Sequence, residues 1–349
     1  MFPGDGIGPE IVAESLRVLD AVSGSKGIGF RLHYCEIGDA ARKRTGEAVP
    51  LQALELFRRH KLALKGPVGE SVGDFVSKLR IGFDLYANVR PVISYPRISP
   101  PALRGDIDLV VVRENLEDVY ISKESQIDAG TWKLEGVFSR RECERIARYS
   151  FDLARGRRKR LAIGHKSNIL RKTHGLFAEV FGDMSKAYTD VIFESYYADS
   201  LSAHLVRRPA DFDVIACPNL IGDILSDLAA EVGGGLGLAG SANVNPEAGM
   251  GLFEPTHGSA PDIAEKKIAD PISQIRCTAL MLRFLSEEVG DSYSTAAATI
   301  EEAISRYISN SSVGNLPIHL GGRAGTTQVA DSIISEIRRI QENGEHLHS

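Results

Sequence analysis

A strand-like run that passes directly into a helix constrains the fold of this chain more than any other feature. The apolar segment at 212–217 is typical of a buried strand. A helical pattern follows over 222–233, and Ile224, Leu225 and Leu228 are expected to form one apolar face of that helix. A buried strand followed at once by an amphipathic helix is the repeating unit of α/β proteins.

Two aspartates lie on this predicted helix. Asp223 and Asp227 are four residues apart, so both carboxylates are expected on one side of the helix, near its start. Two oxygen ligands on a rigid element suit a hard divalent cation such as Mg²⁺ or Mn²⁺. Glu231 extends the pair into an acidic stripe, which is also what an ordinary solvated helix face carries. The pair alone therefore leaves both interpretations open.

The same alternation of strands and helices continues through most of the chain and predicts an α/β protein with a largely parallel sheet. Apolar runs predict strands at 61–65, 108–113, 160–164, 190–195 and 212–217. Helical periodicity predicts helices at 9–23, 51–60, 140–155, 168–182, 222–233, 272–289, 295–309 and 327–342. A Gly-rich stretch at 233–251 breaks the alternation and is expected to be a crossing between domains.

A second break in the alternation predicts a projecting hairpin. Residues 119–138 have no helical pattern and indicate two strands joined by a loop at 128–130. A hairpin that cannot bury both of its faces alone usually packs on a partner chain. The segment therefore predicts a dimer.

Composition and charge limit the class of protein. At 349 residues the chain is too long for one compact core, so about two domains are expected. No apolar run is long enough to span a bilayer, and the opening lacks the features of a signal peptide. The net charge of −5 argues against a nucleic-acid binder, and the basic cluster at 155–160 is expected to be a solvated helix end. Four widely spaced cysteines predict reduced thiols in a cytoplasmic protein.

The opening segment at 3–10 is a glycine turn that runs into a helix, with Pro9 suited to the first helical position. Backbone amides in such a turn can approach an anionic or nucleotide ligand. Its spacing differs from the GxGxxG fingerprint, and only Met1 and Phe2 precede it in place of the usual strand. By itself the turn is a weak indication of a ligand site.

Seven motifs occur in an order that characterises one known family. They are GDGIGPE at 4–10, DLYANVRP at 84–91, VRENLEDVY at 112–120, HKSN at 165–168, FDVIACPNLIGDILSD at 212–227, FEPTHGSAPDIA at 253–264 and LGGRAGTT at 320–327. The chain resembles the β-decarboxylating dehydrogenases, which comprise the isopropylmalate, isocitrate and homoisocitrate dehydrogenases. The resemblance covers essentially the whole chain, and GDILSD together with HGSAPDIA is very specific.

The resemblance implies a two-domain α/β/α fold of the isopropylmalate dehydrogenase type, with a central mixed sheet and distinct from the Rossmann fold. Residues 1–87 and 236–349 would form the cofactor-binding domain. Residues 88–235 would form the metal, substrate and dimerisation domain, with a hairpin arm at 119–138. The active site would lie between the domains of a homodimer and be completed by the partner subunit, with a tetramer as the alternative.

The family oxidises a 2-hydroxy acid to a β-keto acid, and loss of CO₂ then leaves an enolate. By resemblance, Mg²⁺ or Mn²⁺ bound by Asp223, Asp227 and the partner subunit's Asp199 stabilises that enolate as a Lewis acid. The partner subunit's Lys166 matches the proton-transfer lysine, and crowding by cations would depress its pKa toward neutrality. Tyr120 matches the acid that protonates the enolate carbon.

Three arginines match the cluster of guanidinium groups that binds the substrate carboxylates in bidentate fashion: Arg80, Arg90 and Arg113. A surface salt bridge is the usual alternative for an arginine. Arg113 argues against that alternative, because it ends a fully apolar strand.

The resemblance also assigns residues to the cofactor side. They are Glu254, His257, Gly258, Ser259, Ala260, Asp262 and Asp270. Asp262 matches the acidic residue that accepts hydrogen bonds from the adenosine ribose in members that use NAD, and it would repel a 2′-phosphate. NAD is therefore the expected cofactor. Two positions depart from the family: Asp270 replaces an asparagine that contacts adenine, and His319 replaces a common aspartate.

The stretch before Arg80 is where the family distinguishes its substrates. Isocitrate enzymes of the bacterial NADP type have serine and asparagine where this chain has Asp74 and Val76, and homoisocitrate enzymes tend to have an arginine near Ser77. Val76 suits the isopropyl group of 3-isopropylmalate, with about 1–3 kcal/mol from apolar burial.

The expected substrate is thus 3-isopropylmalate, in leucine biosynthesis, and LKGPVGES at 64–71 resembles archaeal-type isopropylmalate dehydrogenases. The RENLEDVY string at 113–120 is closer to isocitrate and homoisocitrate enzymes, which remain the alternatives, followed by tartrate or malate. A non-catalytic regulatory subunit is a further alternative. Such subunits typically lose the tyrosine, the lysine or a metal aspartate, and this chain keeps all of them.

Overall fold

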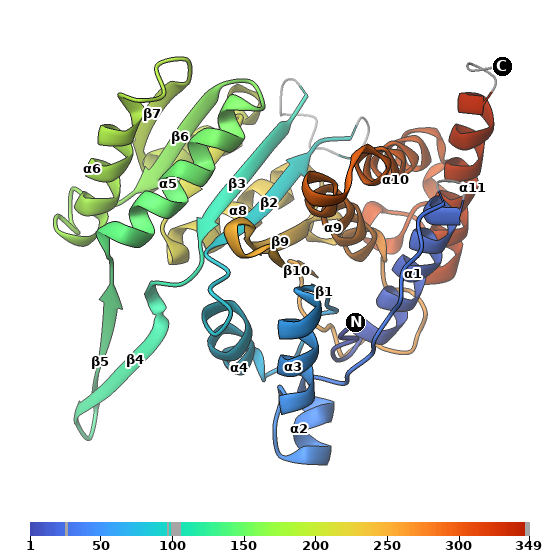
Figure 1. Ribbon diagram of the computed structural model, residues 1–349, viewed down its shortest axis with the longest axis horizontal. Helices are drawn as coiled ribbons and strands as arrows, with labels where there is room; N and C mark the ends of the chain where they lie inside the picture. The colour runs from blue at the N-terminus through green and yellow to red at the C-terminus, as the bar shows by residue number, and fades with distance from the viewer. Residues whose placement is uncertain (25–26, 96–97, 99–105, 346–349) are drawn as a thin grey trace.

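The computed structural model describes residues 1–24, 27–95, 98 and 106–345. Its strands are β1 (Leu62–Leu64), β2 (Ala87–Ile93), β3 (Asp108–Glu114), β4 (Asp118–Asp128), β5 (Thr131–Val137), β6 (Arg160–His165), β7 (Ile192–Tyr197), β8 (Val214–Cys217), β9 (Gly240–Asn245) and β10 (Met250–Pro255). Eight of these strands form one sheet in the order β1-β10-β9-β2-β3-β8-β6-β7 (Figure 1). At one end of the sheet, β3, β8, β6 and β7 run parallel to one another, and at the other end β1 is parallel to β10. The pairings of β10 with β9, of β9 with β2 and of β2 with β3 are antiparallel. The α/β fold with a mixed central sheet, which the resemblance implies, is confirmed. The largely parallel sheet that the alternation predicts is correct only in part, because three of the seven strand pairings are antiparallel.

Helices cover both faces of this sheet. They are α1 (Gly8–Gly24), α2 (Asp39–Thr45), α3 (Leu51–His60), α4 (Val72–Phe75), α5 (Arg140–Arg155), α6 (Thr173–Ser185), α7 (Ala198–Arg207), α8 (Asn219–Gly233), α9 (Ile272–Val289), α10 (Asp291–Asn310) and α11 (Thr326–Glu345). A π-helical turn, η1 (Val76–Ile81), follows α4, and short 3₁₀ turns are η2 (Pro209–Asp211), η3 (Leu236–Leu238), η4 (Pro246–Ala248), η5 (Val313–Asn315) and η6 (Ile318–Leu320). In the described part of the chain, no helix is long and apolar enough to cross a membrane.

Alternation along the central strands separates two apolar cores. Val112 of β3 lies in one core with Phe151 of α5, and its neighbour Val111 lies in another core with Leu225 of α8. This follows because successive side chains of a strand face opposite sides of the sheet. Helices α5 and α8 therefore pack on opposite faces of β3, β6 and β8. At the other end of the sheet, α9 lies on β9 and β10 and packs with α1, α10 and α11 (Figure 1).

The periodicity predicted most elements but gave no helix at α2 or α7 and no strand at β2, β9 or β10, and two expectations within 168–251 need correction. The helix expected at 168–182 begins only at Thr173, and the residues before it form a turn in which the amides of Ile169 and Leu170 donate to the Lys166 carbonyl. The Gly-rich stretch at 233–251 is not simply a crossing. It contains the buried strand β9, whose small and polar residues gave no apolar signal.

The predicted apolar face of α8 is also wrong in part. Leu225 is buried, but the side chain of Ile224 is 61% exposed. Adjacent residues on an α-helix point about 100° apart, so Ile224 and Leu225 cannot both face the same core. Ile224 instead lies on the outer surface of the protein, near Leu220, which is also exposed.

The hairpin arm is present as predicted. Strands β4 and β5 form a separate two-stranded sheet, joined at Ala129 and Gly130, that projects from the body (Figure 1). Every residue of β5 is exposed. The exposed residues include Trp132 and Leu134, and Ile127 of β4 is exposed beside them. The arm therefore presents apolar side chains that no other described residue of the chain covers.

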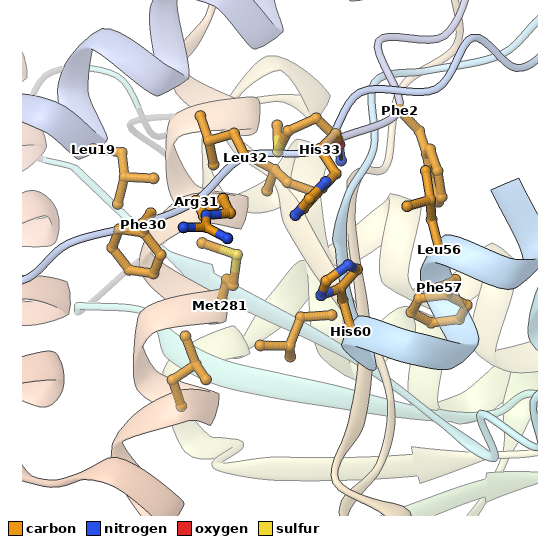
Figure 2. Close-up of a pocket in the computed structure, with 14 residues that line it drawn as sticks. Phe2, Leu19, Phe30, Arg31, Leu32, His33, Leu56, Phe57, His60 and Met281 are labelled. Atoms are coloured by element: carbon orange, nitrogen blue, oxygen red, sulfur yellow. Dashed lines mark hydrogen bonds between the residues drawn. The ribbon is translucent and has the colours of Figure 1, made fainter. Parts of the chain in front are cut away.

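A cavity of about 210 Å³ lies at the outer edge of β1, between that strand and the extended segment at 30–33 (Figure 2). The rings of His33 and His60 stack there with centroids 4.5 Å apart. Met1 and Phe2 form one end of the cavity, and Phe2 pairs with the end of β1 while the Met1 carbonyl accepts from the Cys35 amide. Residues 1–2 are thus held on both sides, which anchors the glycine turn that follows them.

Helix α8 approaches β3 very closely at Gly222. A Cβ atom on Gly222 would lie 2.8 Å from Cβ and Cγ of Arg113. We therefore expect Gly222→Ala to destabilise the protein by about 1–3 kcal/mol through overpacking. Gly182→Ala, within α6 where no atom lies within 4 Å of an added Cβ, should instead stabilise it by about 0.5–1 kcal/mol. Urea unfolding measures the free energy of unfolding of both variants. Equal values for Gly222→Ala and Gly182→Ala would contradict the close approach of α8 to β3.

Candidate active site

Five of the predicted site residues meet around the carboxylate of Asp223. Its Oδ1 accepts hydrogen bonds from Arg90 Nη2, at 3.2 Å, and from Arg113 Nη1, and its Oδ2 accepts from the hydroxyl of Tyr120. Arg90 Nη1 also donates to Asp227 Oδ1 at 3.1 Å. The structure therefore brings both aspartates, two arginines and the tyrosine into one cluster.

The two arginines are placed by the antiparallel pairing of β2 with β3. Arg113 is opposite Asn88 on β2, and Arg90 is two residues further along that strand. Their side chains are only 8% exposed for Arg90 and 1% for Arg113, which excludes the alternative that Arg113 makes a surface salt bridge. Asn88, Ser226 and Asn219 accept the remaining guanidinium hydrogen bonds at 2.8 Å each. Sequence reasoning missed these three acceptors, because short polar residues give no signal of their own.

The charges in this cluster shift one another's pKa values. Burial, reinforced by Arg90 and Arg80, lowers the pKa of Arg113 to about 10. Burial opposes ionisation of Asp223, but the adjacent guanidinium groups outweigh it and hold the pKa of Asp223 below its usual value. Burial raises the pKa of Asp227, because Arg90 offsets only part of that effect. Three arginines that repel one another favour the binding of anionic groups between them.

Arg80 reaches the site from the opposite half of the sheet. It lies near the end of η1, and π-helical turns occur frequently at functional sites. Arg80 Nη2 donates to Glu254 Oε1 at 2.8 Å, and Lys65 Nζ donates to Glu254 Oε2 at 2.5 Å. Asn243 Nδ2 adds a bond of 2.9 Å to Glu254 Oε1. Although burial opposes it, these cations hold the pKa of the Glu254 carboxyl far below its usual range.

Lys65 is a site residue that sequence reasoning missed. Its side chain is 3% exposed, and its ammonium lies 5.1 Å from the ring centroid of Phe75. The signal was available, since Lys65 directly follows an apolar strand, as Arg113 does. A cation at that position in a buried strand needs a buried anion, which Glu254 supplies.

The predicted specificity residues lie on the turns that precede Arg80. Val76 begins η1, about one turn before Arg80, and is half-buried. The carboxylate of Asp74 is paired with Arg42 of α2, and the Ser77 hydroxyl donates to the carbonyl of Asp74. Arg42 therefore neutralises the charge of Asp74 beside Val76.

Lys166 and Asp199 form a second group, separate from the first. Lys166 follows β6 and Asp199 begins α7 after β7, and these parallel strands end side by side. Lys166 Nζ lies 2.9 Å from Asp199 Oδ2. Among the described residues of one chain, no three acidic, histidine or cysteine side chains lie close enough together to hold a metal ion. Asp199 is thus not brought to Asp223 and Asp227 within a single chain.

Two buried histidines hold the backbone around Lys166. The Lys166 amide donates to His174 Nδ1 at 3.0 Å, and His165 Nε2 lies 2.7 Å from the Ser195 hydroxyl. Burial lowers the pKa of His165 to about 4 and also lowers the pKa of His174. Both rings are therefore neutral at neutral pH, and His174 can accept at Nδ1.

The glycine turn at the N-terminus contacts the loop that follows β10. The Ile7 amide donates to the Ser259 carbonyl at 2.9 Å. Gly6 has φ 56°, and a Cβ there would lie 2.0 Å from the Ser259 carbonyl oxygen, so only glycine fits. The predicted cofactor residues from His257 to Asp262 lie on this loop, and Asp262 is exposed. The structure therefore places the turn and the loop side by side, with the amides of Asp5, Ile7 and Gly8 already donating to protein carbonyls.

The two departures from the family pattern are neighbours. Asp270 Oδ2 lies 3.3 Å from His319 Nδ1, and Asp270 Oδ1 accepts from the Ile272 amide at the start of α9. Burial raises the pKa of Asp270 to about 8. The His319 ring lies against Gly237, where an added Cβ would be 2.8 Å from it. The two departures therefore lie side by side, and burial favours the neutral form of both groups, since it also lowers the pKa of His319.

Residues 1–333 match the family described as isocitrate/isopropylmalate dehydrogenase. The chain belongs to this family. A 3-isopropylmalate/3-methylmalate dehydrogenase of Methanocaldococcus jannaschii is 42% identical over 343 residues, which cover 97% of this chain and 98% of that protein. A 3-isopropylmalate dehydrogenase of Sulfurisphaera tokodaii is 39% identical, with 97% of each chain covered. A crystal structure of isocitrate dehydrogenase from Methylococcus capsulatus matches with a TM-score of 0.87 at 37% identity, covering 97% of this chain and 98% of that one.

The donor set of this member of the isocitrate/isopropylmalate dehydrogenase family fits a hard divalent cation. Asp223 and Asp227 supply carboxylate oxygens from one rigid helix, and Cys217, which precedes that helix, is fully buried in an apolar core. The guanidinium groups that now pair with the two aspartates would remain beside the cation, where they can bind an anionic substrate.

The buried ion pair of Lys65 and Glu254 is expected to contribute to the stability of the protein. Glu254→Gln should cost about 3–5 kcal/mol, because it leaves the buried ammonium of Lys65 without a charge partner. Lys65→Met combined with Glu254→Gln should cost less than Glu254→Gln alone, since the double variant buries no unpaired ammonium. Urea unfolding of the two single variants and the double variant measures the coupling. If the losses of unfolding free energy in the two single variants add up to the loss in the double variant, Lys65 and Glu254 do not stabilise each other.

Proposed function

We propose that this chain is a decarboxylating dehydrogenase that converts 3-isopropylmalate to 2-oxo-4-methylpentanoate and CO₂, in leucine biosynthesis. One observation carries the proposal: Arg90 and Arg113 converge on Asp223, to which the Tyr120 hydroxyl also donates. Guanidinium groups for carboxylates, aspartates for a cation and a phenol for proton transfer are the groups this reaction needs. The names of the similar archaeal proteins agree with it.

The substrate's variable group would lie beside Val76. Arg80, Arg90 and Arg113 can bind two carboxylates in forked fashion, and Val76 lies about one turn from Arg80. Isocitrate carries a third carboxylate in place of the alkyl group. Arg42 is paired with Asp74, and Lys78 Nζ lies 4.0 Å from Glu47 Oε2, so both of these nearby cations already have an anionic partner. An alkyl group is therefore favoured over a carboxylate.

The chain's own groups have separate tasks in the reaction. Asp223 and Asp227, with the partner subunit's Asp199, would hold Mg²⁺ or Mn²⁺, which supplies Lewis-acid stabilisation where negative charge develops on the substrate oxygen. The partner subunit's Lys166 would accept the hydroxyl proton while a hydride leaves for the nicotinamide. After CO₂ is lost, Tyr120 would donate its proton to the enolate carbon. Burial raises the pKa of Tyr120, so the phenol carries this proton at neutral pH.

A homodimer with shared sites accounts for the remaining surface features. The arm presents Trp132 and Leu134 to solvent, and α8 presents Ile224. Lys166 and Asp199 lie together but apart from Asp223 in the same chain. A second copy that covers these apolar groups can bring its lysine and aspartate to the cation. We also propose that residues 1–87 with 236–349 and residues 88–235 act as the two domains on either side of the site.

The experiment that tests the function is a turnover panel with the purified protein and Mn²⁺. The panel comprises 3-isopropylmalate, 3-methylmalate, isocitrate, homoisocitrate, malate and tartrate, each with NAD and with NADP. We expect the highest kcat/KM for 3-isopropylmalate with NAD. Higher kcat/KM for isocitrate or homoisocitrate would show that the segment at 74–77 accommodates a carboxylate, and the substrate assignment would then be wrong.

The cofactor is proposed to be NAD, with the adenosine ribose beside Asp262. The loop around this residue meets the glycine turn, and its carboxylate is exposed toward solvent. We expect Asp262→Lys to lower kcat/KM for NAD and to raise it for NADP, because a cation replaces an anion next to a 2′-phosphate. Asp331→Lys, the same charge change on the outer surface of α11, is the matched control. An NAD/NADP ratio that stays constant in Asp262→Lys would remove the argument for the cofactor.

A further inference from the structure

The first residue of the arm also contacts the helix that carries the aspartate pair. Asp118 begins β4 and is 4% exposed, and its Oδ2 accepts a hydrogen bond from the Leu220 amide at 3.0 Å. Helix α8 begins after Pro218 and has no side-chain cap of its own. Asp118 therefore caps α8 from 102 positions earlier in the chain, and its negative charge suits the helix N-terminus.

Glu117 and Tyr120, which flank Asp118 in the sequence, also form hydrogen bonds with the start of α8. The carbonyl of Glu117 accepts from Asn219 Nδ2 at 3.1 Å. The hydroxyl of Tyr120 donates to Asp223 Oδ2. Segment 117–120 thus contacts α8 at three points in register, with Asp118 in the middle. The position of segment 117–120 relative to the first turn of α8 therefore determines the distance between the Tyr120 hydroxyl and Asp223.

The backbone at Asp118 makes this contact possible. Its φ is 67°, in the left-handed region that aspartate and asparagine tolerate better than most residues. Its Oδ1 accepts from the Val119 amide at 2.8 Å, so both carboxylate oxygens are used. One side chain therefore stabilises a local turn of the arm and the start of a distant helix together.

We propose that Asp118 is a positioning residue of the active site: it fixes the first turn of α8 to the base of the arm and so keeps Tyr120 and Asp223 in register. This rests on the proposed function, in which Tyr120 donates a proton and Asp223 binds the cation. Asp118 itself touches neither substrate nor cation. It acts through the two residues whose segments it joins.

Two substitutions remove or alter the carboxylate of Asp118 without changing its backbone conformation. Asp118→Gly accepts the left-handed backbone and removes both hydrogen bonds, and Asp118→Asn accepts the same backbone and keeps one acceptor oxygen. We expect Asp118→Gly to lower kcat for 3-isopropylmalate and the affinity for Mn²⁺ by about 10-fold or more, because supporting contacts of metal sites have effects of this size. KM should change less than kcat, since the substrate arginines do not bond to Asp118. Asp118→Asn should lie between Asp118→Gly and the unsubstituted protein in both properties.

The control is Ser139→Ala, which removes the side-chain cap of α5, touches neither Tyr120 nor α8, and keeps the Ser139 amide that donates to Glu117 Oε2. It should lower Tm without changing kcat or the Mn²⁺ dissociation constant, which titration calorimetry on the full-length protein measures. Unchanged kcat and Mn²⁺ affinity in Asp118→Gly, with only a loss of Tm like that of Ser139→Ala, would overturn the proposal. If Asp118→Gly does not fold, Asp118→Asn takes its place, and unchanged kcat and Mn²⁺ affinity there would overturn it as well. If the unsubstituted protein turns over no substrate of the panel, the proposed function fails, and the Mn²⁺ affinities still decide whether Asp118 supports the aspartate helix.

Discussion

The structure depends on the neutralisation of positive charge that is buried between two strands and a helix. Arg113 is 1% exposed and Arg90 is 8% exposed, and a buried guanidinium group without an anion is costly. Asp223 supplies the anion for both. This requirement explains why α8 must approach β3 so closely that only glycine fits at position 222. It also explains why the helix starts where it does, with Asn219 bound to Arg113.

A second buried charge cluster performs the same task on the opposite half of the sheet. Glu254 neutralises Lys65 and Arg80, and Asn243 links it to Asn88 on β2, which in turn accepts from Arg90. The two clusters are therefore joined by a continuous chain of hydrogen bonds across the sheet. Such a network fixes the positions of the arginines, and Arg113 Nη2 is buried without a hydrogen-bond partner among the described residues, so this nitrogen can donate to an anionic ligand.

The sequence allowed much of the site to be predicted, because its residues belong to motifs with fixed spacing. The structure places Arg90, Arg113, Tyr120, Asp223 and Asp227 in contact, and it pairs Lys166 with Asp199. The roles given to these residues stay predictions. Periodicity also predicted most helices and the parallel strands, since their apolar patterns are strong.

What sequence reasoning missed has a common physical cause, which is that the contacts join distant segments. Strand β9 is buried but built from small and polar residues, so its partners rather than its own pattern define it. The partners of Asp118 and Lys65 are Leu220 and Glu254, which are 102 and 189 positions away, so the local sequence does not identify them. Ile224 is predicted to face inward but is exposed, because a helical pattern identifies the apolar residues without showing which of them face the core.

The pairing of β9 with β2 determines how the two halves of the sheet can move. Only three residue pairs join these strands, and the buried amides of Asn88 and Asn243 are hydrogen-bonded across the junction. The sheet is continuous through this point, so a change in the angle between the halves must be taken up as added twist of the sheet. Twist is opposed by every backbone hydrogen bond of the junction, unlike rotation about a flexible linker. We therefore expect motion between the halves to be small in amplitude and to return elastically to one resting geometry.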